Sequence, residues 1–177
     1  MADPHFDLAP SPWVQRWLTL VRPGGAVLDV AAGAGRHARL AARLGFEVDA
    51  VDRDASLFAD PPPQVRVLEA DIEAGPWPYA GRRFDAIVVT NYLHRPLLPV
   101  LADSLETGGA LIYETFAQGN ERFGKPSNPA FLLAPGELLE AVRGKLRVVA
   151  FEDLVVCDPR PAAVQRLCAR REEGQSC

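Results

Sequence analysis

The sequence predicts an α/β fold in which seven strands form one doubly wound sheet, mostly parallel and finished by a C-terminal antiparallel hairpin. Three observations support this class. Short apolar runs alternate with amphipathic helical segments, which is the pattern of a parallel sheet covered on both faces. The chain has 177 residues, about the size of one domain. Only residues 158–161 separate the last two apolar runs, which is too short for a helical crossover, so these strands pair antiparallel.

The expected strands are short runs rich in Val, Ile, Leu, Ala and Phe. They cover residues 26–30, 46–51, 65–70, 84–90, 110–116, 147–154 and 164–170. Helices are expected at residues 12–20, 36–44, 96–105 and 135–142. Pro12 suits the first position of the first helix, and Gly45 suits the end of the second.

Two connections depart from the helix pattern. After the second strand, residues 54–58 form at most a turn or two, because Pro61, Pro62 and Pro63 prevent a helix from continuing. Residues 117–134 form a long connection rich in Gly, Asn and Pro. A loop of this length in a compact domain is usually functional or disordered. We expect it to be a lid over a site, with a solvated loop as the alternative.

Composition narrows the class of protein. The net charge of -4 gives no basic surface of the kind that nucleic acids usually require, and 48% apolar with 24% charged residues is typical of a soluble globular protein. Residues 1–10 contain no apolar run, so we expect no signal peptide, no membrane association and a cytoplasmic location. Cys157, Cys168 and Cys177 lack CxxC spacing, which argues against a disulfide framework or a zinc site.

The segment from Val27 to Gly35, with the sequence VLDVAAGAG, runs from a buried strand into a glycine-containing turn at the start of a helix. Small residues allow a ligand to lie against the backbone, and free amides at a helix start can face a carboxylate or phosphate. Asp52 ends the second strand roughly 20 residues later, where a carboxylate can accept both ribose hydroxyls of an adenosine. These features predict a nucleoside cofactor.

Two cofactor classes fit this turn. Gly33, Gly35 and Ala38 match the dinucleotide fingerprint, which alone would suggest a nicotinamide-dependent oxidoreductase. Asp29, at the strand end ahead of the glycines, suits the ammonium group of methionine and would lie poorly beside a pyrophosphate. The chain also leaves no room for a separate substrate domain. We therefore favour a methyltransferase over a dehydrogenase.

Five motifs in order resemble those of class I S-adenosylmethionine-dependent methyltransferases, especially the small bacterial type similar to tellurite-resistance methyltransferases. They are VLDVAAGAG from Val27, VDAVD ending at Asp52, EADIE around Asp71, FDAIVV from Phe84 and LETGGAL from Leu105. The resemblance covers most of the chain. It implies a Rossmann-like fold, S-adenosyl-L-methionine as the cofactor, and one methyltransferase domain over residues 1–177, in which residues 1–22 are an N-terminal helix region.

The resemblance also implies a set of cofactor contacts. Asp29 and the loop from Ala31 to Gly35 hold the methionine part, Asp52 holds the ribose, and Asp71 accepts the adenine amino group while the backbone of Ile72 reads the ring edge. The full expected set is Asp29, Ala31, Ala32, Gly33, Gly35, Asp52, Arg53, Asp71, Ile72, Thr90 and Asn91. Ala31 stands where the family has its first glycine, and Ala32 where many members have cysteine, so the methionine part could be slightly displaced.

The acceptor side is expected beyond the fourth strand. Tyr92 and His94 are the candidate catalytic residues, although His94 is equally plausible as a hydrogen-bonded structural residue. Glu114, Arg122 and Lys125 are candidate substrate contacts, with a structural role for Glu114 left open. The Asn/Asp-Pro-Pro-aromatic sequence of many base-amine methyltransferases is absent here, which again argues against nucleic acid.

We therefore expect direct methyl transfer to a small-molecule acceptor, with no metal ion and with a general base only if the acceptor must lose a proton. Two alternatives stay open: an RNA or protein methyltransferase, and a cofactor-binding module that needs a partner. The sequence does not identify the acceptor atom or the oligomeric state.

Overall fold

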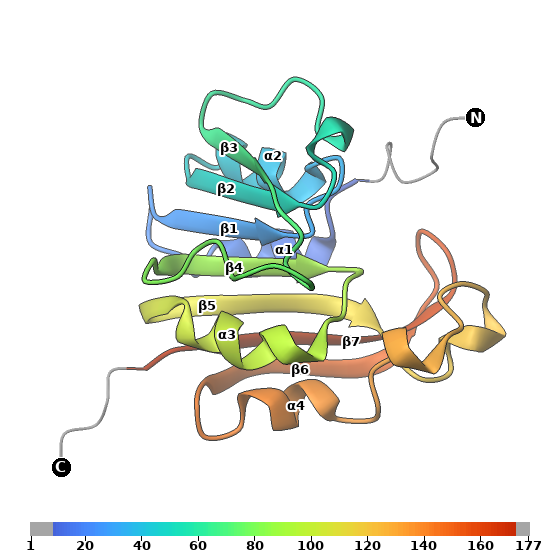
Figure 1. The fold of residues 1–177 in the computed structure, drawn as a ribbon. Coiled ribbons are helices and arrows are strands. Elements are labelled where there is room, and N and C mark those ends of the chain that lie inside the picture. The colour runs from blue at the N-terminus through green and yellow to red at the C-terminus, as the bar shows by residue number, and fades with distance from the viewer. Residues whose placement is uncertain (1–8, 173–177) are drawn as a thin grey trace, which may run out of the picture.

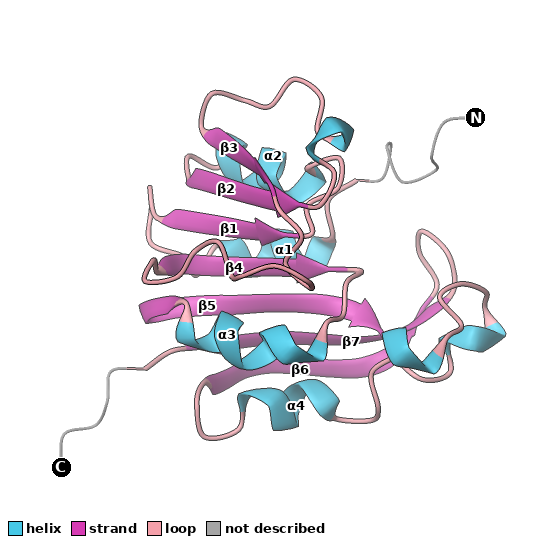
Figure 2. Cartoon of the chain, viewed as in Figure 1, coloured by secondary structure: helices cyan, strands magenta, loops and turns pink. Residues whose placement is uncertain are grey.

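A single seven-stranded sheet with the order β3-β2-β1-β4-β5-β7-β6 forms the centre of the protein, as the computed structural model shows (Figures 1 and 2). Its strands are β1 (Ala26–Val30), β2 (Glu47–Asp52), β3 (Val65–Glu69), β4 (Phe84–Thr90), β5 (Leu105–Phe116), β6 (Arg147–Val156) and β7 (Ala162–Arg170). Strands β1 to β5 are parallel, and β7 pairs antiparallel with both β5 and β6. The predicted fold class is confirmed. The structure describes residues 9–172, so most of the opening segment and Cys177 lie outside it.

Helices cover both faces of the sheet. They are α1 (Pro12–Leu18), α2 (Arg36–Arg43), α3 (Leu98–Asp103) and α4 (Glu137–Val142), with 3-10 turns η1 (Ala55–Leu57), η2 (Arg95–Leu97), η3 (Asn120–Arg122) and η4 (Pro129–Phe131). In Figure 1, α3 and α4 lie on the near face and α1 and α2 behind the sheet. None of the helices within residues 9–172 has the length and apolar character needed to span a membrane.

Alternate residues of each strand point into two separate cores, as the pleat of a strand requires. In β4, Ile87 and Val89 belong to the core beneath α3 and α4, whereas Ala86 and Val88 belong to the core beneath α1 and α2. All four are almost fully buried. This two-sided burial explains why residues 86–89 of β4 are all apolar.

Within the described chain no helix covers the near face over β1 and β2; the segment between β3 and β4 passes over this region instead (Figure 1). Tyr79 packs edge-to-face against Phe84, with ring centroids 5.4 Å apart. Asp49, on β2, is buried and binds the guanidinium groups of both Arg66 and Arg82. These contacts replace a crossover helix. The short connection predicted after β2 is likewise found, as η1.

The main difference from the predicted elements lies between α3 and β5. We expected a helix to Leu105 and a strand from Ala110, but the helix ends at Asp103 and the strand begins at Leu105. Arg83 donates hydrogen bonds to the carbonyl oxygens of both Asp103 and Leu105. These two carbonyl groups therefore have a partner without a further turn of helix. Leu105 then pairs with Phe84 and is fully buried. Burial of Leu105 in the sheet therefore overrides its helical spacing.

Candidate active site

The loop after β1 has a backbone that favours glycine. Ala31, Gly33 and Gly35 have φ angles of 54°, 53° and 77°, and Ala31 adopts this left-handed conformation at a cost of about 1 kcal/mol. A Cβ added to Gly33 would meet no atom within 4 Å, so this side of the loop is open. A ligand can therefore approach the backbone at Gly33.

Gly35 has a packing role that the sequence does not show. A Cβ at Gly35 would overlap the ring of Phe58, so the absence of a side chain here makes room for that ring. The contact of Gly35 with a cofactor stays a prediction. Phe58 is buried, and the guanidinium of Arg39 stacks 4.7 Å from its ring centroid. Gly35 thus joins the start of α2 to the segment after β2.

Asp52 fastens the glycine loop to the end of β2. Its Oδ2 accepts a hydrogen bond of 2.8 Å from the backbone N–H of Gly33, and its Oδ1 accepts one of 3.0 Å from Asp54. Because β1 and β2 are parallel neighbours, their carboxyl ends meet at this edge of the sheet. The carboxylate is held in a fixed orientation beside the open loop.

Asp29 lies beneath the loop. Its side chain is buried, with 1% exposure for the residue, and accepts a hydrogen bond of 2.9 Å from the N–H of Ala38. Burial raises the pKa of Asp29 to about 7, although the Ala38 hydrogen bond acts in the opposite direction. Asp29 is not among the residues that line the neighbouring cleft.

Asp71 and Ile72 follow β3 on the same edge. The Oδ1 atom of Asp71 accepts hydrogen bonds of 3.0 Å from the N–H groups of Ala74 and Glu73, which lower the pKa of the carboxyl group. The Ile72 side chain is buried in the core, while Asp71 and Arg53 are exposed. Asp71 is therefore an ionised acceptor at the end of β3.

A cleft of about 790 Å³ opens beside the loop. Six of the predicted site residues line it: Ala32, Gly33, Thr90, Asn91, Tyr92 and Lys125. Sequence reasoning missed several other lining residues that carry charge, polarity or aromatic surface: Arg36, His37, Glu73, Phe116, Phe131 and Arg160. The cleft thus joins the glycine loop to segments far along the chain.

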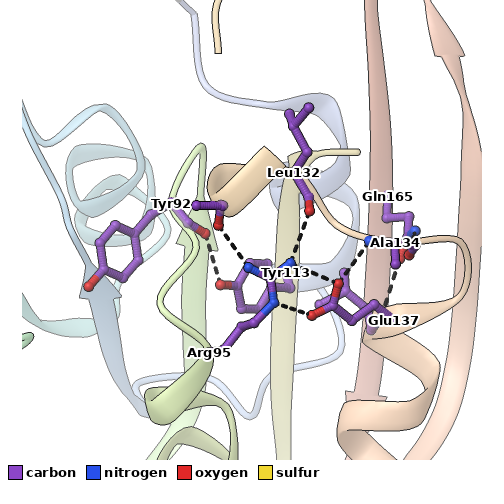
Figure 3. Close-up of polar contacts among 9 residues, drawn as sticks. Tyr92, Arg95, Tyr113, Leu132, Ala134, Glu137 and Gln165 are labelled. Atoms are coloured by element: carbon purple, nitrogen blue, oxygen red, sulfur yellow. Dashed lines mark hydrogen bonds and ion pairs between the residues drawn. The ribbon is translucent and has the colours of Figure 1, made fainter. Parts of the chain in front are cut away.

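Tyr92 is held by its backbone while its side chain lines the cleft. The hydroxyl of Tyr113 donates a hydrogen bond of 2.8 Å to the carbonyl oxygen of Tyr92, and Figure 3 shows the Tyr92 ring turned away from this contact. The buried Tyr92 hydroxyl has no partner within the described residues. Burial, and next the Glu73 carboxylate, raises the pKa of Tyr92, so the phenol stays neutral and can donate a hydrogen bond.

His94 lies just behind the cleft and is not among its lining residues. Its side chain is 25% exposed, and its Nδ1 lies 3.9 Å from Oε2 of Glu73, which does line the cleft. The general-base role of His94 stays a prediction.

His37, in the first turn of α2, has a defined tautomer. Its Nε2 accepts a hydrogen bond of 3.1 Å from the N–H of Ser11, so Nδ1 carries the proton and donates to the hydroxyl of Thr90 at 3.2 Å. Burial, assisted by Arg36, lowers the pKa of His37 to about 3 and keeps the ring neutral. This residue orients Thr90; its place directly after the glycine loop was the only signal in the sequence.

The three predicted substrate contacts have different surroundings. Glu114 forms an ion pair with Arg166, and its side chain is only 12% exposed. Arg122 donates to the carbonyl of Gly119 at 3.2 Å and stacks on Phe123. Neither lines the cleft, whereas Lys125 does. Glu114 therefore has the structural partner that the sequence left open as its alternative.

The loop of residues 117–134 is fastened near its end. Arg95 donates to the carbonyl oxygens of Ala130 and Leu132, at 2.7 and 3.0 Å, and binds Glu137 through both carboxylate oxygens (Figure 3). The Gln165 side chain donates to the Ala134 carbonyl at 2.6 Å. Residues between these contacts and η3 are largely exposed. Closure of this segment as a lid stays a prediction.

Comparison with known proteins gives a domain match and a fold. Residues 27–109 match the model of a family described as a methyltransferase domain. TehB from Haemophilus influenzae superposes with a TM-score of 0.77 at 18% identity, over 95% of this chain and 64% of TehB. A search of curated proteins gave no match.

Two further structures share the fold. One belongs to a complex between the Haloferax volcanii Trm112 methyltransferase activator and a methyltransferase, with a TM-score of 0.71, 14% identity and 91% and 90% of the two chains covered. The other is the Burkholderia thailandensis 1,6-didemethyltoxoflavin-N1-methyltransferase with 1,6-didemethyltoxoflavin and S-adenosylhomocysteine bound. Its TM-score is 0.66 at 20% identity, over 92% of this chain and 77% of that chain.

Residues 27–109, just under half of the chain, thus match a methyltransferase domain, and the fold over nearly the whole chain is similar to that of TehB. The match to a methyltransferase domain agrees with the sequence-based choice of a methyltransferase over a dehydrogenase.

Proposed function

We propose that this protein transfers the methyl group of S-adenosylmethionine to a small organic acceptor bound in the cleft at the carboxyl edge of the sheet. The observation that carries the proposal is the junction of the open glycine loop with a cleft of about 790 Å³. This volume lies within the roughly 300–1,000 Å³ typical of small-molecule sites. The same cleft continues past Tyr92 to residues that belong to other loops, which leaves space beyond the loop for an acceptor.

The residues beside the loop fit the cofactor. We assign the methionine part to the loop from Ala31 to Gly35, with Asp29 beneath it, and the ribose to Asp52. The adenine ring then lies by Asp71, Ile72 and Arg53. The open space at Gly33 and the ionised Asp71 at the end of β3 support this arrangement. The expected displacement of the methionine part at Ala31 remains part of the proposal.

The cofactor supplies a methyl group already activated on a sulfonium. A nucleophilic atom of the acceptor forms a bond to the methyl carbon while the sulfur–carbon bond breaks, and the electron pair stays on sulfur in S-adenosylhomocysteine. The protein contributes mainly by positioning the acceptor and excluding water. Thr90 and Asn91 lie beside the loop, and the neutral Tyr92 phenol donates a hydrogen bond to the acceptor. His94, assisted by Glu73, takes a proton if the acceptor has one to lose.

Transfer of a labelled methyl group tests the proposal. Purified protein is incubated with methyl-labelled S-adenosylmethionine and a cell extract separated by size into small molecules, RNA and protein. We expect the label in the small-molecule fraction. Label confined to RNA or protein would contradict the choice of acceptor class.

A second candidate function is a module that is active only with a partner. It is favoured by the likeness to the Haloferax methyltransferase found in complex with its activator. The edge strand β6 exposes Val148, Val149 and Val155, each about 40–50% accessible, which would suit a protein contact. Turnover of a small molecule by the purified chain alone would exclude this candidate.

A further inference from the structure

The charges that line the cleft are unbalanced. Arg36, Lys125 and Arg160 line it, whereas Glu73 is the one carboxylate among its described lining residues. His37 adds no charge, because burial lowers its pKa to about 3. The cleft therefore carries an excess of positive charge in a chain whose net charge is -4.

These three cations form no ion pair within residues 9–172, unlike the arginines around them. Arg166 binds Glu114 and Glu152, and Arg95 binds Glu137. Within the described residues Arg36 donates a hydrogen bond to the carbonyl oxygen of Ala9, at 3.1 Å, and the carboxylates of Glu114 and Asp29 act on it without a direct contact. Cations on a concave site that no acidic side chain binds directly attract anions to it.

The cofactor accounts for one of the three cations. Arg36 begins α2 directly after the glycine loop, so it lies beside the segment to which we assign the methionine carboxylate. Burial lowers the pKa of Arg36, and a bound carboxylate would compensate for its poor solvation. Lys125 and Arg160 lie on other segments, the loop after β5 and the turn between β6 and β7, which come together at one end of the sheet (Figure 1).

A buried amide holds those two segments together. Asn120 is 2% exposed; its Nδ2 donates to the carbonyl oxygen of Pro126 at 2.9 Å, and its Oδ1 accepts from the N–H of Ala163 at 3.2 Å. Pro126 follows Lys125 directly, and Ala163 lies three residues after Arg160. The N–H of Ala117 also donates to the Ala163 carbonyl, at 2.9 Å. The two cations are therefore carried by segments that are fixed to each other.

Aromatic surface lies in the same cleft. Phe116 and Phe131 both line it, and Phe131 is 52% exposed, which is high for a large apolar side chain. An acceptor with an apolar body would cover this surface and gain roughly 25 cal/mol for each Å² removed from water.

We propose that the methyl acceptor is an organic anion, whose carboxylate or phosphate binds Lys125 and Arg160 while its apolar body packs against Phe116 and Phe131. This proposal rests on the proposed function, because it takes the glycine loop and Arg36 as the cofactor side of the cleft. It adds Arg160 as a binding residue and Asn120 as a positioning residue.

Binding of matched fluorinated probes tests the anion site. Protein saturated with S-adenosylhomocysteine is titrated with 4-fluorobenzoate, 4-fluorophenyl phosphate and the uncharged 4-fluorobenzamide, and binding is followed by fluorine NMR. We expect at least one anionic probe to bind more tightly than the amide. Lys125→Gln and Arg160→Gln should each weaken that anion about tenfold and leave the amide unchanged, since a hydrogen bond to a charged group is lost.

Arg143→Gln is the matched control. Arg143, at the C-terminal end of α4, is exposed, pairs with Glu140 and lines no part of the cleft, so its loss removes one charge and should not change probe binding. The preferred anion identifies carboxylate or phosphate as the recognised group. Equal binding of anions and amide, or variants at Lys125 and Arg160 that bind as the control does, would overturn the anion site. Failure of the wild-type protein to bind S-adenosylhomocysteine would instead overturn the proposed function.

Discussion

Replacement of Asp52 by alanine tests the assignment of the ribose site. The Asp52 carboxylate is held between the N–H groups of Gly33 and Asp54, so it presents a charged acceptor in a fixed place beside the open loop. A hydrogen bond to a charged group contributes about 1.5–3 kcal/mol. We expect Asp52→Ala to weaken S-adenosylmethionine binding by about 2 kcal/mol, which is a roughly 30-fold increase in Kd.

Asp52→Ala also removes the hydrogen bond that holds the glycine loop at Gly33. Two further variants separate this loss from the loss of the ribose acceptor. Asp54→Ala removes a neighbouring carboxylate that caps η1 and accepts from the N–H of Ser56, with no part in the cofactor assignment. It should leave the affinity unchanged. Asp52→Asn keeps an oxygen for the Gly33 N–H but loses the charge, so its affinity should fall between those of wild type and Asp52→Ala.

Calorimetric titration of folded protein measures all three variants. Wild-type affinity in Asp52→Ala would refute the ribose assignment. An equal loss in Asp54→Ala would show that the segment after β2 acts as scaffold and that the Asp52 carboxylate has no specific part in binding.

Three further predictions concern the residues around the loop. Gly35→Ala should lower both the stability of the protein and its cofactor affinity, because the added Cβ would overlap Phe58 and the φ of 77° disfavours alanine. Thermal unfolding and calorimetry measure the two effects. Wild-type stability in this variant would contradict the packing role of Gly35. His37 is neutral when folded, with its pKa lowered from 6.5 to about 3, so the unfolded state binds a proton first and the free energy of unfolding should fall as pH drops from about 6.5 toward 3. His37→Gln should reduce this dependence of the unfolding free energy on pH, measured by urea titration at several pH values. An unchanged dependence would argue against His37 as its source. Glu114→Gln should lower stability by about 3 kcal/mol through loss of the largely buried pair with Arg166 and leave cofactor Kd unchanged; a variant as stable as wild type, with lower turnover, would restore Glu114 as a substrate contact.

Much of the fold could be predicted because its signals are local. β1 and β4 have the predicted bounds, since both are mostly apolar runs followed by a turn. The sheet end with β7 antiparallel followed from the short connection before it. The start of β5 could not be predicted, because it depends on Arg83 and on pairing of Leu105 with Phe84, which are tertiary contacts.

The candidate site likewise contains residues that the sequence predicts from local signals and residues that only tertiary contacts bring in. Gly33 and Asp52 could be predicted to lie together, because the turn after β1 and the end of β2 meet at one edge of the sheet, and a hydrogen bond joins them. Their cofactor roles stay predictions. Arg160 was missed because it lies in a short turn without periodicity and reaches the cleft only through the β6–β7 hairpin. The packing of Phe58 against Gly35 could not be predicted, because Phe58 lies in an irregular segment and reaches Gly35 only in the folded chain.

Titration of the purified wild-type protein with S-adenosylmethionine and, separately, with NAD tests the central claim most directly. The open loop at Gly33, the buried Asp29 and the Asp52 carboxylate predict saturable binding of one S-adenosylmethionine per chain and no binding of NAD. Binding of NAD without affinity for S-adenosylmethionine would contradict the account.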